Sequence, residues 1–166
     1  MESKPHKMIT IGRHVRVDFP GLGFRNVDAK VDTGAFRTVL HCERCEEVDT
    51  ANGKLLEADF KLEGNEIKRM YFSEYFSKEF KSSFGEKEKR FCVKTSIKIG
   101  RKKIKSSVSL TDRSDMKFQV LIGRKTLLRR FLVDVSRKFA SLDTHSNYQH
   151  IIDLLVASAP IVETFL

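Results

Sequence analysis

The sequence lacks the long apolar segments that would place it in or across a membrane. No uninterrupted apolar run approaches the roughly 20 residues that span a bilayer, and the stretch Met-Glu-Ser-Lys-Pro-His-Lys at the N-terminus has no signal-peptide core. Internal repeats and low-complexity tracts are also absent. At 166 residues and 40% apolar composition, the chain falls in the size range of a single domain with one core. We expect a cytoplasmic protein with no membrane partner.

Cysteine is scarce, and the number of cysteines is odd. Three cysteines in a chain without a secretion signal predict free thiols and not a disulfide framework. Cys42-Glu43-Arg44-Cys45 has the spacing of half a zinc site, and His41 or Cys92 could add ligands. No second Cys-x-x-Cys or histidine pair completes it. We interpret the cysteines as surface or half-buried thiols and His41 as a hydrogen-bonded structural residue.

Two motifs of cofactor-dependent chemistry are missing. There is no His-Glu-x-x-His helix for zinc-assisted hydrolysis and no Gly-x-x-x-x-Gly-Lys-Ser/Thr loop for a nucleotide. The prediction is therefore a protein with no metal and no cofactor.

Acidic residues are outnumbered by basic ones. The chain carries 31 Lys and Arg against 22 Asp and Glu, a net charge of +9 that attracts acidic partners. Several of the basic residues are clustered within residues 94–105: Lys94, Lys98, Arg101, Lys102, Lys103 and Lys105. Aromatic residues for base stacking are not interleaved there, so nucleic acid is not the predicted partner, and a solvated strand face explains the charges.

Alternation of apolar and polar residues is the main structural signal, and it predicts β-strands. Alternating or continuous apolar segments occupy residues 9–19, 27–31, 56–62, 67–72, 93–99, 104–110, 120–123 and 131–135. We expect mainly antiparallel pairing, with 93–99 and 104–110 as one hairpin. Residues 73–90 show no clear period and indicate a long excursion or hairpin around 82–85.

Helical signals are few. Residues 124–130 predict a short helix, and apolar residues at helical spacing predict another over 144–158. The expected organisation is a tail at 1–8, an all-β domain at 9–138 and a C-terminal helical extension at 139–166.

One acidic turn stands out within this pattern. Asp32-Thr33-Gly34 ends an alternating strand, where the chain turns away from the sheet and Gly34 is free to adopt unusual backbone angles. A second segment, Leu121-Ile122-Gly123, precedes the short helix. The simplest interpretation of Asp32 alone is a turn acid bonded to local amides.

Together these segments resemble the retropepsin-like aspartic peptidases, in which Asp-Thr-Gly-Ala ends a strand and a later apolar-apolar-Gly segment passes beside it. The closer resemblance is to a bacterial family labelled ATP-dependent zinc proteases, often encoded beside the ligase that adds glutamates to ribosomal protein S6. The matching stretches are 11–13, 29–35, 40–41, 82–85, 109–113, 120–124 and 131–134. Phe36-Arg37 departs from the family, which usually has Arg and small hydroxyl residues there.

The resemblance implies an acid-protease barrel and a second carboxylate. Two acids sharing a proton divide the roles of base and acid in peptide hydrolysis, and this chain has one such turn. A C2 homodimer would supply the dyad, with Asp32 from each chain. Thr33 would brace the two turns, Gly34 would allow close backbone approach, and residues 82–85 would form a flap.

The resemblance also implies residues that contact a peptide or protein substrate. These substrate-binding candidates are Ala35, Arg37, Ser83, Gly85, Arg113 and Ile122. Arg113 could pair with Asp112 or face the substrate channel. The positive charge suits an acidic substrate, and the family's gene neighbourhood suggests a glutamate-rich ribosomal tail.

The resulting prediction is a homodimeric aspartic endopeptidase with catalytic residues Asp32, Thr33 and Gly34. A non-catalytic basic module that holds nucleic acid or acidic protein on a degenerate peptidase fold is the alternative. The zinc enzyme of the family label is a third possibility.

Overall fold

The computed structural model describes residues 8–62, 64, 66–81 and 87–139, and it is built almost entirely of strands. In chain order the elements are β1 (Ile9–Gly12), β2 (His14–Phe19), β3 (Phe24–Val31), β4 (Thr38–His41), β5 (Arg44–Thr50), β6 (Gly53–Phe60), β7 (Lys68–Phe72), β8 (Tyr75–Lys81), β9 (Lys87–Ile99), β10 (Lys102–Thr111), β11 (Val120–Ile122), α1 (Arg124–Leu127) and β12 (Phe131–Asp134). The predicted all-β class is confirmed.

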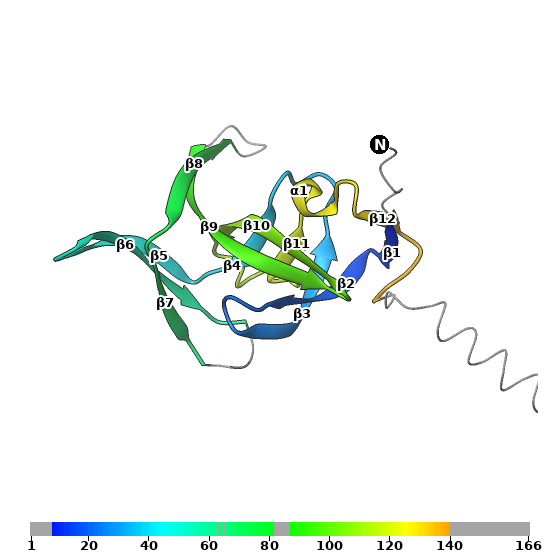
Figure 1. The fold of residues 1–166 in the computed structure, drawn as a ribbon, viewed down its shortest axis with the longest axis horizontal. Coiled ribbons are helices and arrows are strands. Elements are labelled where there is room, and N and C mark those ends of the chain that lie inside the picture. Colours follow the sequence, from blue (N-terminus) through cyan, green and yellow to red (C-terminus); the bar gives the residue numbers. More distant parts are fainter. Residues whose placement is uncertain (1–7, 63, 65, 82–86, 140–166) are drawn as a thin grey trace, which may run out of the picture.

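Six strands pair in a closed ring at the centre of the molecule (Figure 1). The order is β10-β4-β11-β3-β2-β9, and the pairing of β9 with β10 completes the circle. Alternate residues of these strands point inward to a core of fully buried side chains that includes Val17, Leu40, Ile97, Val108 and Ile122. The expected hairpin of residues 93–99 and 104–110 is confirmed as β9–β10.

Three strand pairings are parallel, although mainly antiparallel pairing was predicted. β4 pairs with β10, β3 with β11, and β1 with β12. Parallel partners are joined by long crossovers, so nothing in the local sequence specifies them. The parallel β3–β11 pairing brings the segments after β3 and after β11 to the same end of the ring, and the antiparallel β11–β4 pairing places the segment before β4 there as well.

The alternating segment at residues 9–19 is two strands and not one. β1 leaves the ring to pair with β12, and the chain bends at Arg13 before β2 begins. The backbone of residue 137 lies so close to Gly12 that an added Cβ would be 2.6 Å from the Arg137 carbonyl oxygen. Glycine at position 12 therefore permits the close contact that accompanies the bend.

A separate three-stranded sheet, β5-β6-β7, lies at the opposite end of the molecule from β1 and β12 (Figure 1). The sequence pattern missed β5, because its side chains are mostly polar and exposed. On one face of this sheet Arg44 and Arg69 hold two buried carboxylates, Glu57 and Asp59. The Arg69 guanidinium holds the pKa of the Asp59 carboxyl below its usual range.

The segment 73–90 is more regular than its sequence indicates. β8 and β9 pair antiparallel from Tyr75–Val93 to Lys81–Lys87, so the hairpin interpretation is confirmed. The residues between the two strands, including Ser83 and Gly85, lie outside the described part of the chain.

The helix after β11 is shorter than the predicted 124–130. α1 ends at Leu127, because Leu128 adopts extended backbone angles and Arg129 has a positive φ of 59°. The helix predicted at 144–158 lies outside the described residues.

Candidate active site at the Asp32 turn

The two sequence motifs meet at one end of the ring. β11 lies beside β3 with Ile122 opposite Val31, and the next amide, Asp32 N–H, donates to the Ile122 carbonyl at 3.0 Å. The Asp32 turn therefore begins against the segment that carries Leu121-Ile122-Gly123. Ile122 is fully buried, so its contribution here is through its backbone.

The Asp32 carboxylate is half-buried and oriented by its own turn. Oδ1 accepts hydrogen bonds from the backbone N–H groups of Gly34 at 2.9 Å and Ala35 at 3.2 Å. The interpretation of Asp32 as a turn acid bonded to local backbone amides is thus correct for Oδ1. No hydrogen bond from the described residues reaches Oδ2, which leaves an acceptor for an outside donor.

Arg124 fastens the turn from the other motif. Its Nη1 donates to the carbonyls of both Thr33 and Gly34 at 2.8 Å. The α1 backbone adds two more bonds, from Arg124 N–H to the Ala35 carbonyl and from Lys125 N–H to the Phe36 carbonyl, each 2.9 Å. Sequence reasoning matched Arg124 to the family but assigned it no role, since a contact between residues 33 and 124 has no local signature.

Gly123 is required by the close approach of the two segments. A Cβ built on Gly123 would meet the Arg37 carbonyl oxygen at 2.3 Å and the Ala35 carbonyl oxygen at 3.0 Å. Beneath this contact, the buried Thr38 and Thr126 hydroxyls are hydrogen-bonded at 2.8 Å, and Gly123 N–H donates to Thr38 Oγ1 at 3.3 Å. The turn thus rests on a packed, hydrogen-bonded base.

Arg113 does not pair with Asp112. Its Nε donates to the Phe118 carbonyl at 3.0 Å, whereas Asp112 Oδ1 accepts from Ser114 N–H at 2.9 Å. Burial and the charge of Arg90 lower the pKa of the Arg113 guanidinium, and the Asp32 carboxylate opposes that shift. The Arg113 guanidinium is therefore close enough to Asp32 for the two charges to interact.

His41 positions the Arg113 backbone, as expected of a structural histidine. The imidazole is 1% exposed, and its Nδ1 accepts a hydrogen bond from Arg113 N–H at 2.9 Å. Burial lowers the pKa of His41, although the nearby carboxylates of Asp112 and Glu43 oppose this shift. A neutral imidazole fits the acceptor role.

The remaining substrate-binding candidates differ in their surroundings. Ala35 is half-buried in the turn, and Phe36 is 56% exposed next to it. Arg37 is half-buried, with its guanidinium 5.3 Å from the Phe36 ring centre and 5.5 Å from that of Phe76. Its Nε is buried without a hydrogen-bond partner among the described residues.

The cysteines are less exposed than expected. Cys42 and Cys92 are buried, at 2% and 0% exposure, and only Cys45 is half-buried. The pKa of the Cys45 thiol is raised mainly by a hydrogen bond with Cys42 and, to a smaller extent, by burial. Burial also raises the pKa of the Cys92 thiol. These shifts disfavour the thiolates that nucleophilic or metal chemistry needs.

The described part of the chain contains neither a cluster of metal-binding side chains nor a membrane-spanning helix. No three side chains among its His, Cys, Asp and Glu residues gather as metal ligands would. None of its helices has the length and apolarity needed to cross a bilayer.

An aspartate in a glycine turn at a strand end, fastened by an apolar-apolar-Gly-Arg segment, defines the retropepsin-like class. A family model described as retropepsin-like aspartic endopeptidase RimB matches residues 10–144. The chain belongs to this family.

The curated relatives carry a different name. "Probable alpha-L-glutamate ligase" proteins from Shewanella pealeana and Desulfotalea psychrophila are 29% and 24% identical to it over 134 and 127 residues. The aligned regions cover 78% and 75% of this chain but only 29% and 27% of those proteins. The chain therefore spans less than a third of the length of these relatives.

A solved structure shares the fold. The Legionella pneumophila protein Lpg0085, of unknown function, superposes with a TM-score of 0.65 at 23% sequence identity. The match covers 81% of this chain and 98% of that protein.

Proposed function

We propose that this protein is an aspartic endopeptidase that works as a homodimer. The observation that carries the proposal is the Asp32 carboxylate: a half-buried acid whose Oδ1 is fixed by two backbone amides and whose Oδ2 has no hydrogen bond from the described residues. One oxygen sets the orientation, and the other remains available for water or a second acid. The family match to retropepsin-like endopeptidases supports this interpretation.

The chemistry requires two such carboxylates. When two acids lie close together they share one proton, so one activates water as a base while the other donates to the peptide carbonyl oxygen. The chain has a single Asp-Thr-Gly sequence. In the proposed enzyme a second copy related by a two-fold axis supplies the other carboxylate.

Exposed apolar side chains near α1, β1 and β12 support a dimer. Leu128, Leu132 and Val135 are 67%, 52% and 69% exposed, and Met8 before β1 is 45% exposed. Burial of these side chains against a partner would be favourable. α1 also carries Arg124, which contacts the Asp32 turn, so a partner on this side would lie beside the turn.

The preferred substrate in this proposal is an acidic polypeptide. Arg113 and Arg124 place positive charge near Asp32, and the whole chain carries a net charge of +9. Cations at the mouth of a site raise the local concentration of acidic segments.

The decisive experiment replaces the proposed nucleophile activator. Asp32→Asn keeps the shape of the side chain but cannot act as a base, so we expect cleavage of an acidic peptide library to fall at least about 1,000-fold. Thermal unfolding and sedimentation should match the unmodified protein. Cleavage at the original rate by the purified variant would contradict the proposal.

A mixed dimer tests the shared site directly. Differently tagged unmodified and Asp32→Asn chains, purified as the mixed species, should be as inactive as the Asp32→Asn homodimer, because each site needs both carboxylates. Activity of about half the unmodified value would indicate that each chain works alone.

A further inference from the structure

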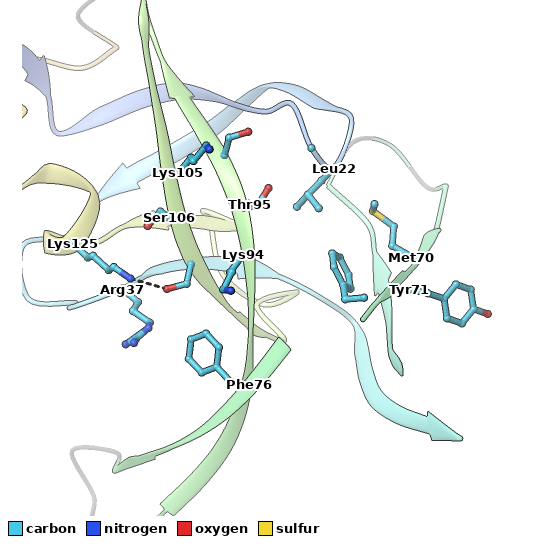
Figure 2. Close-up of a pocket in the computed structure, with 14 residues that line it drawn as sticks. Leu22, Arg37, Met70, Tyr71, Phe76, Lys94, Thr95, Lys105, Ser106 and Lys125 are labelled. Carbon is cyan, nitrogen blue, oxygen red and sulfur yellow. Dashed lines mark hydrogen bonds between the residues drawn. The ribbon is translucent and has the colours of Figure 1, made fainter. Parts of the chain in front are cut away.

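A pocket of about 820 Å³ opens beside the β9–β10 ribbon, and Asp32 does not line it (Figure 2). Four cationic side chains line the pocket, and each comes from a different segment: Arg37 precedes β4, Lys94 lies in β9, Lys105 in β10 and Lys125 in α1. Repulsion between like charges opposes such a gathering unless anions offset it. Lys94 Nζ is paired with the exposed Glu74 carboxylate at 3.1 Å, whereas no ion pair of Arg37, Lys105 or Lys125 is found within the described part of the chain. The lining thus keeps an excess of positive charge, which favours an anionic ligand.

Strand register places these cations on one face of the ribbon. Lys94 pairs with Ser107, and Lys105 lies two residues away on the same strand, so the three share a face. Lys125 Nζ donates to Ser107 Oγ at 3.0 Å and therefore reaches the same face. In Figure 2 this bond is the dashed line, with Arg37 and Phe76 beside it.

Arg37 joins this face through an aromatic ring. Phe76 lies opposite Cys92 in the β8–β9 pair, on the side of β9 that also carries Lys94. The Arg37 guanidinium lies 5.5 Å from the Phe76 ring centre, and its buried Nε has no hydrogen-bond partner among the described residues. An unpaired buried N–H is costly unless a ligand accepts from it.

The other side of the pocket is apolar and lies around an unpaired strand edge. β2 pairs with β9 only at residues 98–99, and β8 pairs only at 87–93, so 94–97 have no strand partner on that edge within the described chain. Leu22, Met70 and Phe72 line this side, where the buried hydroxyls of Thr95 and Ser106 lack partners among the described residues.

An extended peptide matches both sides. Its backbone can bond to the unpaired edge, while alternate side chains point to opposite faces. One set would meet the cations and the other the apolar side. The volume of about 820 Å³ is far larger than a single carboxylate needs.

We propose that this pocket is a second peptide-binding site that takes a segment with alternating acidic side chains and so determines specificity outside the cleavage position. Arg37 follows the Asp32 turn in sequence, and its carbonyl packs against Gly123, so the pocket adjoins the proposed active site. The inference rests on the proposed endopeptidase function.

Binding is measured in the Asp32→Asn background, so that the peptide is held and not cut. The probe is a fluorescein-labelled octapeptide of alternating Glu and Ala, followed by anisotropy, and the Gln–Ala octapeptide is the neutral comparison. Lys94→Gln combined with Lys105→Gln should weaken Glu–Ala binding about tenfold, because two cations are lost. The matched control is Lys98→Gln with Lys103→Gln, a cross-strand pair on the same ribbon outside the pocket. It should weaken binding less than about twofold.

A neutral variant separates the pocket from general charge. Thr95→Val removes a buried unpartnered hydroxyl at constant charge, so the protein should unfold at an equal or higher temperature and yet bind the Glu–Ala peptide more weakly. Equal losses in the two lysine pairs, or equal binding of the Gln–Ala peptide, would overturn the pocket assignment. Because no cleavage is involved, these results stand apart from the Asp32→Asn activity test: loss of the endopeptidase proposal would leave a measured pocket affinity intact.

Discussion

Two candidate reactive regions flank β4, the Asp32 turn before it and the Cys42–Cys45 segment after it, and their side chains have opposite environments. Before β4, Asp32 is half-buried, held through one oxygen by backbone amides and fastened by Arg124. After β4, the Cys42 thiol is buried and donates to the Arg44 carbonyl, and the pKa of Cys45 is raised. The comparison teaches that environment, more than residue type, separates a group prepared for reaction from one that stabilises the fold.

The largest effect short of removing Asp32 itself is expected at Gly123. Gly123→Ala would force a Cβ against the Arg37 carbonyl, where the gap is 2.3 Å, so the Asp32 turn must move or the domain must open. We expect a loss of about 3 kcal/mol in unfolding free energy and loss of cleavage. Urea denaturation measures the change in unfolding free energy. Gly21→Ala, with its nearest atom at 3.3 Å, is the milder control.

The next effect concerns the fastening of the turn. Arg124→Gln removes both bonds to the Thr33 and Gly34 carbonyls, so the carboxylate should lose its fixed position more than the fold loses stability. We expect kcat/KM to fall about tenfold with a change of about 1 kcal/mol or less in unfolding free energy. Arg124→Lys, which restores one donor, should recover part of kcat. An equal loss in both lysine and glutamine variants would contradict a positioning role.

A smaller effect, on stability, is expected when the pH is lowered, and it comes from His41 at the end of β4. Burial holds the folded-state pKa of His41 below its ordinary value of 6.5, so protonation favours the unfolded chain. The stability that neutral His41 contributes is present above pH 6.5 and is lost as the pH falls through the folded-state pKa.

The slope from this single proton cannot exceed about 1.4 kcal/mol per pH unit. Urea denaturation from pH 8 to pH 5 should show a shallower slope in His41→Gln than in the unmodified protein. Identical slopes would mean that His41 does not titrate between the folded and unfolded states. The pKa of His14 is also lowered, so the difference between variants is the relevant quantity.

The smallest effect is expected at the thiols. Cys42→Ser with Cys45→Ser should leave cleavage within about twofold, because neither thiol touches the Asp32 turn in the described contacts. Treatment with a chelator should likewise leave the rate unchanged. A large loss of activity in either experiment would restore the cysteines as functional groups and remove the contrast between the two ends of β4.

Sequence patterns predicted the elements better than their pairing. Alternating apolar residues in the sequence identified β3, β6, β9 and β10, although only β3 shows burial that mainly alternates, and β6 and β10 contain runs of consecutive buried residues. This pattern missed β4, whose residues are all buried, and β5, whose residues are mostly exposed. The parallel pairings were missed because they join segments far apart in the chain.

In the candidate site too, local sequence motifs were predicted, whereas contacts between distant segments were not. Asp32-Thr33-Gly34 and Leu121-Ile122-Gly123 were recognisable as sequence motifs, and their contact is confirmed by the Asp32–Ile122 bond. The bonds from Arg124 and the four cations of the pocket were not found, since each depends on segments that meet only in the folded chain. Two lysines of the pocket, Lys94 and Lys105, lie on the strand face that the pattern indicated to be solvated.

The order in which the site is assembled has a consequence for biosynthesis. Ile122 and Arg124, which hold the Asp32 turn, and Phe131–Asp134, which pairs with β1, are translated about 90 residues or more after Asp32. Contacts of such sequence separation form late and slowly. A nascent chain would therefore carry the Asp-Thr-Gly motif long before it carries the residues that hold its turn, so the turn would take its final form only late in synthesis.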